Sequence, residues 1–267
     1  MARKRPTKWL KVAREAGASF DPAEKPQWIS RILTRAGALA PGEVDAALRN
    51  GRVTLSGKTV RGAMTLVRAA DDVRLDGKPV SQLAPTLVLM FHKPKGVVTA
   101  PTDPELQGTV FERLDQVLTE PLKRYGWHAV GRLDRNTTGL LLFTNDERFV
   151  SHATLPGTHL AKTYVAKIQG TATDEKLEPL RKGLSLHDGE TRPASAKLRS
   201  ADTVELTITE GRNHQVKHML GAVGLPVIEL HRERIGEIVI DVEEGQFREL
   251  TLEEIKVGLG FSAARAP

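Results

Sequence analysis

Cysteine is absent from the 267 residues of the chain, and apolar residues never form a long run. Without cysteine, disulfide bonds and thiolate catalysis are excluded, and a structural zinc site would lack its usual ligand. No apolar stretch approaches about 18 residues, and the start, MARKRPTKWLKVAR, is charged throughout without the apolar core of a signal peptide. We therefore expect a soluble, cytoplasmic protein without a membrane partner.

The loops that commonly hold phosphates or carry a catalytic serine are also missing. Neither GxGxxG nor the P-loop pattern GxxxxGKS or GxxxxGKT occurs, and no GxSxG turn is present. Nucleotide-dependent transfer therefore loses its sequence support. A Ser-His-Asp triad stays compatible with the composition, but nothing in the sequence anchors it.

The charge of the chain favours a polyanionic partner. The net charge is +6, from 39 basic and 33 acidic residues. Residues 1–26 hold seven basic and three acidic residues, so this extension contributes +4. Its composition is compatible with disorder, and it serves either as an RNA-contacting arm or as a solubilising segment. The rest of the chain is nearly balanced, so a nucleic-acid surface there must be a local basic stripe.

Two folding units are predicted, with a short linker between them. In residues 27–82, apolar residues recur at helical spacing from Trp28 to Leu33, and a second short helix follows near 43–50. The segments RVTLSG and DDVRLDGKPV are typical of strands, and Asp76–Gly77 is typical of a hairpin turn. The stretch SQLAP then has the composition of a linker.

Residues 87–267 change to many strands with a few helices. The candidate strands are TLVLMF, GLLLFT, KTYVAKIQG, TVELTITEG and GEIVIDV. Alternation in 164–168 and 204–208 indicates strands that bury one face, whereas Leu140–Phe143 has the composition of a strand buried on both faces. The pattern predicts an α+β fold with a mixed, mainly antiparallel sheet.

One acid stands between two arginines just ahead of that buried run, in GRLDRNTTGLLLFTND (131–146). At the far end, residues 144–147 fit the capping box of a helix start, but Asp134 has no such structural reason. Arg132 and a basic helix face would keep its carboxylate ionised, which suits a nucleophile, a general base or a structural ion pair. A glycosidase would need a second carboxylate, and nothing marks one.

The segment EGRNHQVKHMLGAVG (210–224) predicts a helix after an alternating strand. We expect Asn213 to cap this helix and Gly224 to end it. Its inward stripe is Val216, Met219, Leu220 and Val223. Its opposite face and the preceding turn present His214, Lys217, His218 and Arg212, a basic group that can hold a carboxylate or a phosphate. Zinc is disfavoured, because Gln215 stands where the metalloprotease pattern has Glu and no third ligand is apparent.

Two further features fit either an RNA-modifying site or a purely structural role. Tyr164 lies in an alternating strand, where its ring packs in the core or offers a face to a flipped base. The stretch 93–96, KPKG, forms a rigid basic turn that suits a phosphate backbone or simply faces solvent.

Five segments together resemble the ribosomal RNA pseudouridine synthases of the branch that joins a small S4-type RNA-binding domain to the catalytic domain. They are GRLDRNTTGLLLFTND, KTYVAKIQG, EGRNHQVKHML, FHKPKGVVTA and ELHRERIG. The resemblance covers about residues 28–255 and is greatest to the small-subunit enzymes. It implies an S4-like domain at 27–82 and a catalytic domain at 87–267, after a basic extension at 1–26.

The same resemblance implies the chemistry. Asp134 matches the essential aspartate, which attacks the nucleoside or removes a sugar proton during cleavage of the uridine glycosidic bond. Tyr164 matches the aromatic residue that packs on uracil, and Lys217 matches the basic partner of the aspartate. The expected substrate contacts are Arg132, Lys93, Lys95, Arg212, Gln215 and Arg232. No cofactor or metal is implied, and the expected partner of the monomer is ribosomal RNA or an assembling ribosomal subunit.

Three alternatives to a small-subunit enzyme stay open at this point. The substrate could be large-subunit ribosomal RNA, or the chain could be an RNA-binding ribosome-assembly factor without turnover. A nucleosidase or glycosidase that uses Asp134 would instead release a free base.

Overall fold

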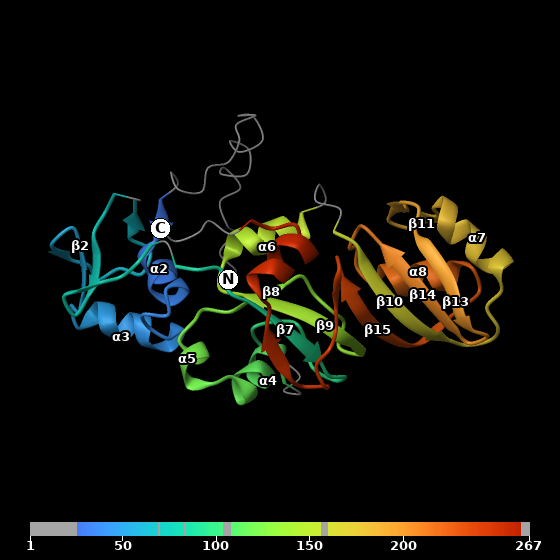
Figure 1. Cartoon of the computed structure of the whole chain (residues 1–267), viewed down its shortest axis with the longest axis horizontal. Coiled ribbons are helices and arrows are strands. Elements are labelled where there is room, and N and C mark those ends of the chain that lie inside the picture. Colours follow the sequence, from blue (N-terminus) through green and yellow to red (C-terminus); the bar gives the residue numbers. More distant parts are fainter. Residues whose placement is uncertain (1–25, 69, 83, 104–107, 156–159, 263–267) are drawn as a thin grey trace, which may run out of the picture.

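The computed structural model describes residues 26–68, 70–82, 84–103, 108–155 and 160–262. It shows a small N-terminal unit beside a larger domain built on one long sheet (Figure 1). Residues 1–25, which make up nearly all of the predicted basic extension, lie outside the described residues. Within the described ranges, no helix combines the length and the hydropathy that crossing a bilayer requires.

The N-terminal unit packs two short helices with two small sheets. Its elements are β1 (Gln27–Trp28), α2 (Ile29–Arg35), η1 (Pro41–Glu43), α3 (Val44–Arg49), β2 (Val53–Leu55), β3 (Lys58–Thr59), β4 (Leu66–Val67), β5 (Val73–Leu75) and β6 (Lys78–Pro79). The sheets have the orders β3–β2–β5–β6 and β1–β4, and their core includes Ile29, Leu33 and Leu48. The predicted hairpin turn is confirmed, because Asp76 and Gly77 have φ values of 49° and 77° between β5 and β6.

The first helix differs from the prediction at its start. The helical spacing places Trp28 inside the helix, but the residue lies in β1 and is 40% exposed. The guanidinium of Arg31 lies 4.6 Å from the centre of its ring. The helix and its buried stripe begin at Ile29, since apolar spacing alone does not locate the first residue of a helix.

The larger domain is built on a nine-stranded sheet. Its strands are β7 (Val88–Lys93), β8 (His128–Val130), β9 (Thr137–Thr144), β10 (Lys162–Ile168), β13 (Ser195–Ser200), β14 (Thr203–Ile208), β15 (Val227–Ile235), β16 (Ile238–Val239) and β17 (Phe247–Glu249). The main order is β13–β14–β10–β15–β9–β7–β17, with β16 beside β15 and β8 beside β9. Among the strand pairs of this sheet in the described residues, only β15 with β9 is parallel. The predicted mixed, mainly antiparallel sheet is confirmed.

Helices lie along this sheet (Figure 1). They are α4 (Val110–Val117), α5 (Glu120–Lys123), α6 (Glu147–Thr154), α7 (Asp174–Lys182), α8 (Gln215–Ala222) and the π-helix η2 (Glu254–Gly258). A hairpin of β11 (Ser185–Leu186) and β12 (Gly189–Glu190) follows α7.

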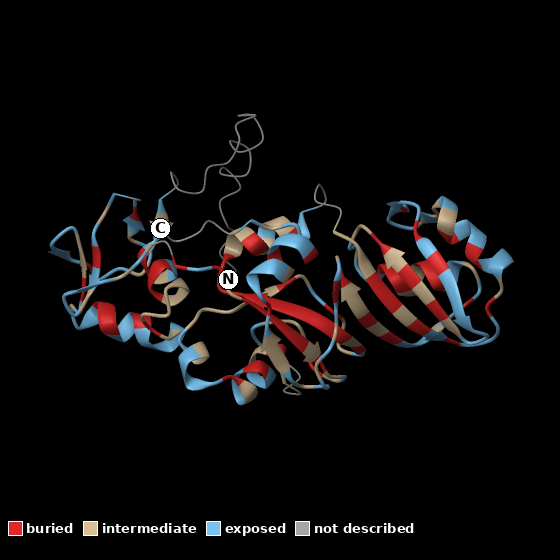
Figure 2. Ribbon diagram, in the orientation of Figure 1, coloured by how far each residue is buried: buried red, intermediate tan, exposed pale blue. Residues whose placement is uncertain are grey.

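Strand β9 feeds two hydrophobic cores, because alternate side chains of a strand point to opposite faces of the sheet. Leu141 and Phe143 belong to the core that contains Met219 of α8, whereas Leu140 and Leu142 belong to the core that contains Phe149 of α6. Figure 2 shows this strand buried along its length. The prediction of a strand buried on both faces is confirmed.

The start of α6 corrects the predicted capping box. Asp146, and not Thr144, is the N-cap, and its carboxylate accepts a hydrogen bond from the backbone N of Arg148 at 3.0 Å. Thr144 is still part of β9 and pairs with Val88, so its Oγ1 donates to the backbone O of Leu87 at 2.7 Å instead. Strand β9 thus extends to Thr144, the residue that the capping-box pattern assigned to the start of the helix.

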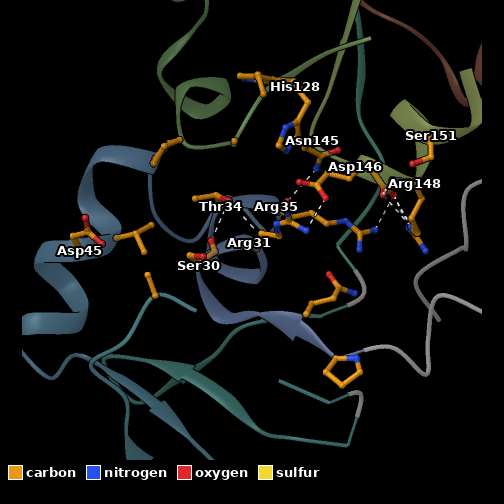
Figure 3. Close-up of a pocket in the computed structure, with 18 of the residues that line it drawn as sticks. Ser30, Arg31, Thr34, Arg35, Asp45, His128, Asn145, Asp146, Arg148 and Ser151 are labelled. Carbon is orange, nitrogen blue, oxygen red and sulfur yellow. Dashed lines mark hydrogen bonds and ion pairs between the residues drawn. The ribbon is translucent and has the colours of Figure 1, made fainter. Parts of the chain in front are cut away.

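The two units are joined through polar groups that come from both of them (Figure 3). Nη2 of Arg35 on α2 donates to Oδ2 of Asp146 at 3.0 Å. The side-chain amide of Asn145 donates to the backbone oxygens of Arg35 and of Pro85, in the linker, each at 3.0 Å. A groove of about 960 Å³ lies beside these contacts, lined by α2 and by the start of α6.

Candidate active site

Asp134 lies in the turn between β8 and β9, and the backbone of this turn is held in place by neighbouring groups. Oγ1 of Thr99 donates to the backbone O of Leu133 at 2.9 Å and accepts from its N at 3.2 Å. Within the turn, the N of Thr137 donates to the O of Asp134 at 3.0 Å. The position of the carboxylate is therefore set by the fold of the turn.

Lys93 anchors the same turn from inside the protein. It ends β7 and is fully buried, and its Nζ donates to the backbone oxygens of Pro94, Arg135 and Thr137 at 3.0, 3.1 and 2.9 Å. Burial lowers its pKa to about 8, although the nearby Asp134 carboxylate acts in the opposite direction. The predicted phosphate contact of Lys93 is not supported by this geometry, because its ammonium is enclosed by carbonyl groups of the protein.

Two donors from the start of α8 meet one oxygen of Asp134. Nζ of Lys217 lies 2.7 Å from Oδ2, and Nδ1 of His214 lies 2.8 Å from the same oxygen. The Asp134 side chain is 26% exposed, so it is reachable from solvent. The contact that the sequence predicts between Lys217 and Asp134 is present.

The electrostatics of the site keep Asp134 ionised. Burial by itself raises the pKa of this carboxyl, but the hydrogen bonds from Lys217 and His214 outweigh burial and hold the pKa below its ordinary value. The flanking arginines are not the source of this effect. Arg132 is exposed, and Arg135 pairs with Asp103 at 3.3 Å. The predicted contribution of Arg132 to this pKa is thus replaced by that of His214.

Tyr164 combines the two roles that the sequence left open. It is 8% exposed and belongs to a hydrophobic core, yet it also lines a small cavity together with Asp134. Its hydroxyl lies 3.5 Å from Nη1 of Arg232 on the neighbouring strand β15. The ring is therefore fixed by packing while one edge remains at the site.

Arg232 is buried beside the site. It is 2% exposed, and its Nε donates to the backbone O of Leu140 at 2.7 Å. Its guanidinium carbon lies 5.9 Å from the centre of the Tyr164 ring. The predicted contact between Arg232 and an RNA backbone is not supported by this geometry, because β15 is an inner strand of the sheet and the side chain is enclosed by the protein.

Gly139 permits the close approach of β9 and β15 that brings these residues to the site. Its φ is +106°, and a Cβ atom there would overlap the backbone of Arg232. Only glycine satisfies both conditions without strain. The parallel pairing at this point places Arg232, and through it Tyr164, next to the turn of Asp134.

Arg212 and Gln215 stabilise the turn before α8. Arg212 donates to Asp188, Gly189 and Glu190 of the β11–β12 hairpin. Gln215 is buried, accepts from the backbone N of Arg212 at 3.0 Å and donates to Glu210. Both side chains are engaged by protein groups, so the predicted substrate contacts by Arg212 and Gln215 are not supported by their geometry.

The N-terminus of α8 also differs from the prediction. Its N-cap is His214, with a left-handed backbone (φ 49°, ψ 23°), and not Asn213. The sequence places His214 on the basic helix face that was expected to keep Asp134 ionised, but it gives His214 no individual role there. The i, i+3 spacing of His214 and Lys217 is the signal that could have paired them, because such residues share a face.

Two depressions meet at Asp134 and share Arg132, Leu133 and His214. The larger has a volume of about 300 Å³, and the smaller, of about 60 Å³, reaches Tyr164. The groove of about 960 Å³ between the two units does not include Asp134, and we place the chemistry where the ionised carboxylate lies. Lys95 is exposed, and its contact with RNA, like that of Arg132, stays a prediction. The described residues contain no group of three or more His, Asp or Glu side chains suited to a metal ion.

Comparison with known proteins agrees with this architecture. Residues 87–222 match the family described as RNA pseudouridylate synthase. A solved structure described as a pseudouridylate synthase is 29% identical and superposes with a TM-score of 0.59, covering 86% of this chain and 98% of the other. The chain belongs to the RNA pseudouridylate synthase family.

Three similar proteins within the family have names that refer to a ribosomal subunit. The chain is 40% identical over 233 residues to the ribosomal small subunit pseudouridine synthase A of Escherichia coli strain K12, which covers 86% of this chain and 96% of the relative. It is 38% identical over 231 residues to the enzyme of the same name from Yersinia pestis, with 85% and 96% covered. The ribosomal large subunit pseudouridine synthase B of Bacillus subtilis is 34% identical over 235 residues, with 85% and 93% covered.

Proposed function

We propose that this protein isomerises a uridine of ribosomal RNA to pseudouridine and that its substrate is the RNA of the small subunit. The proposal is supported by the names and the near full-length coverage of the relatives, among which those acting on the small subunit reach higher identity than the large-subunit enzyme of Bacillus subtilis. The observation that carries it is the ionised Asp134 carboxylate beside the ring of Tyr164.

The chemistry assigns one task to each of three residues. Asp134 attacks the target nucleoside or removes a sugar proton while the bond between N1 of uracil and C1′ of ribose breaks. Lys217 holds the carboxylate ionised, and Tyr164 packs on the uracil ring as the base turns. As the bond from C5 to C1′ forms, Asp134 is released from the nucleoside in the first route or returns the proton to the sugar in the second. The proton on C5 then leaves and N1 gains a proton. The reaction has no net oxidation or reduction, so we propose that no cofactor or metal takes part.

The target base must leave its stacked position before Asp134 can reach it. Extrusion of a base costs a few kcal/mol, which phosphate contacts can offset. We propose that the exposed Arg132 and Lys95 provide such contacts near the site, with Arg132 helping to displace the base. Residues 27–82 would act as an S4-like RNA-binding domain and 87–267 as the catalytic domain, with the basic extension 1–26 adding further RNA contacts.

The remaining assignments concern the state and location of the enzyme. We propose that the enzyme acts as a monomer. Ribosomal RNA, free or in an assembling subunit, would be met in the cytoplasm.

Release of tritium from RNA that carries [5-³H]uridine tests the proposal. We expect release from small-subunit ribosomal RNA with the wild-type protein and none with Asp134→Ala. Release from large-subunit RNA alone would overturn the choice of subunit, and free labelled uracil would indicate a nucleosidase. RNA binding without release would indicate an assembly factor.

A further inference from the structure

His214 lies at the site but has no task in the chemistry proposed above. Its Nδ1 is 2.8 Å from Oδ2 of Asp134, the same oxygen that Lys217 contacts at 2.7 Å. A carboxylate has two oxygens, and both of these donors use one of them. Within the part of the chain that the structure describes, both donors use Oδ2, so Oδ1 is left available to a substrate.

The fold itself does not explain a histidine at this position. His214 has φ 49° and ψ 23°, a left-handed conformation that glycine and asparagine adopt more readily than other residues. It is the N-cap of α8, yet its side chain makes no capping hydrogen bond to that helix. Histidine adopts this conformation more often than most non-glycine residues, but the conformation still has a cost, and the contact with Asp134 offsets it.

Lys217 alone would not fix the orientation of the carboxylate. Its ammonium is a point charge on a flexible stem, so a single contact lets the carboxylate rotate about its bond. The imidazole of His214 is planar and approaches from the turn before α8, whereas Lys217 reaches Asp134 from within the helix. Two donors on the same oxygen restrict this rotation more than one does.

We propose that His214 is a positioning residue for the isomerisation: its Nδ1–H fixes Oδ2 of Asp134, so that Oδ1 is presented to the target nucleoside. The inference rests on the proposed function, because it takes Asp134 as the reacting carboxylate. The His214 ring lines both depressions, and its side chain is 43% exposed.

His214 can be replaced by residues that readily adopt the same left-handed backbone. Such variants separate the effect of the hydrogen-bond donor from the effect of the backbone conformation. His214→Gly keeps the left-handed turn and removes the donor, whereas His214→Asn keeps the turn and places an amide donor near the position of Nδ1. We expect kcat for tritium release to fall about 10- to 100-fold in His214→Gly with little change in KM, the size expected for a lost hydrogen bond to a charged group. His214→Asn should retain most of the activity.

Added imidazole provides a second measurement. It should raise kcat only if the His214 side chain acts as a donor, and not if the side chain merely supports the fold. Because the position is open to solvent, imidazole should restore part of the kcat of His214→Gly and leave that of Lys217→Ala unchanged. His187→Asn, on the exposed β11–β12 hairpin, is the control and should behave as wild type. A wild-type kcat in His214→Gly, or no rescue by imidazole, would overturn the proposal.

A second pair keeps the test decisive if the glycine variant does not fold, which thermal melting reveals. His214→Asp matches His214→Asn in size but presents a negative charge and no donor to Asp134, so it should be slower by at least about tenfold; equal rates would contradict the proposal. The Asp134→Ala variant distinguishes a failure of the proposed function from a failure of the role proposed for His214. If it releases tritium, the proposed role of Asp134 fails; if it is inactive while His214→Gly is normal, only the role of His214 fails.

Discussion

Arg35 and Asp146 form an ion pair between the two units of the molecule, with 3.0 Å between Nη2 and Oδ2. Asp146 is buried and also accepts hydrogen bonds from Arg148 and Thr86. Burial raises the pKa of its carboxyl, but the bonds from Arg148 and Thr86 and the charge of Arg35 outweigh burial and lower it. The small unit is thus attached to the catalytic domain through a carboxylate that must stay charged.

Asp146→Asn should lower the free energy of unfolding by about 3 kcal/mol, because it leaves two arginines beside a neutral group in a buried site. Urea unfolding measures this change. Glu147→Gln is the control, since Glu147 pairs with Arg31 at the surface and its loss should cost less than about 1 kcal/mol. Because the folded pKa of Asp146 is lowered, its contribution is complete above its ordinary value of 3.8 and is lost as pH falls through the folded value. Equal losses in the two variants would contradict this view.

Lys217→Met should change the pH dependence of the reaction. Burial raises the pKa of Asp134 and Lys217 lowers it, so removal of Lys217 lets the pKa rise. The acid side of the profile of tritium release against pH should therefore move to higher pH, and the rate at neutral pH should fall about tenfold or more. Lys256→Met, an exposed lysine on η2, should leave the profile unchanged. An unmoved acid side in Lys217→Met would show that Lys217 does not hold Asp134 ionised.

Lys93→Met should destabilise the protein by about 2 kcal/mol, because it leaves buried carbonyl groups without a donor. Lys95→Met, in the same turn but exposed, should have little effect.

The contribution of Lys93 to the free energy of unfolding should also depend on pH, with a defined sign. The pKa of Lys93 is about 8 in the folded state and 10.5 ordinarily, so the unfolded chain binds more protons between these values. Its contribution to the free energy of unfolding should rise with pH over this interval, and urea unfolding of Lys93→Met should lack the rise.

Gly139→Ala should destabilise the protein more than Gly170→Ala does. Both glycines have positive φ, +106° and +93°, so each substitution carries backbone strain of about 1 kcal/mol. A Cβ at 139 would also overlap the backbone of Arg232, whereas one at 170 meets open space. The difference should be about 2 kcal/mol in thermal or urea unfolding. Equal effects would mean that the β9–β15 contact relaxes easily.

The backbone features of the fold were the most predictable from the sequence. The run Leu140–Phe143 indicated a doubly buried strand, and Asp76–Gly77 indicated a hairpin, because both depend on residues that are close in the chain. The directions of long side chains were less predictable. Lys93 and Arg232 have the positive charge that is typical of phosphate-binding residues, so the sequence suggested contacts with RNA. In the structure their side chains are buried, and they donate to carbonyl groups of residues that lie tens of positions away in the chain.

The candidate site was predictable only in part. The residue pattern alone left Asp134 as a reacting group or a structural ion pair, and the resemblance to the family supplied its expected role. The sequence placed His214 with Lys217 in a basic group that can hold a carboxylate, but it did not identify the contact of His214 with Asp134, because that contact depends on the left-handed backbone of His214 itself. Asn213 was predicted as the N-cap of the helix, one residue before the observed N-cap.

The turn that carries Asp134 leads directly into β9, whose alternate side chains serve both hydrophobic cores. A methyl group deleted from one side chain of this strand would loosen the core on that face of the sheet, so both cores depend on the same eight residues. The reactive acid is therefore attached to a strand on which the packing of both faces relies.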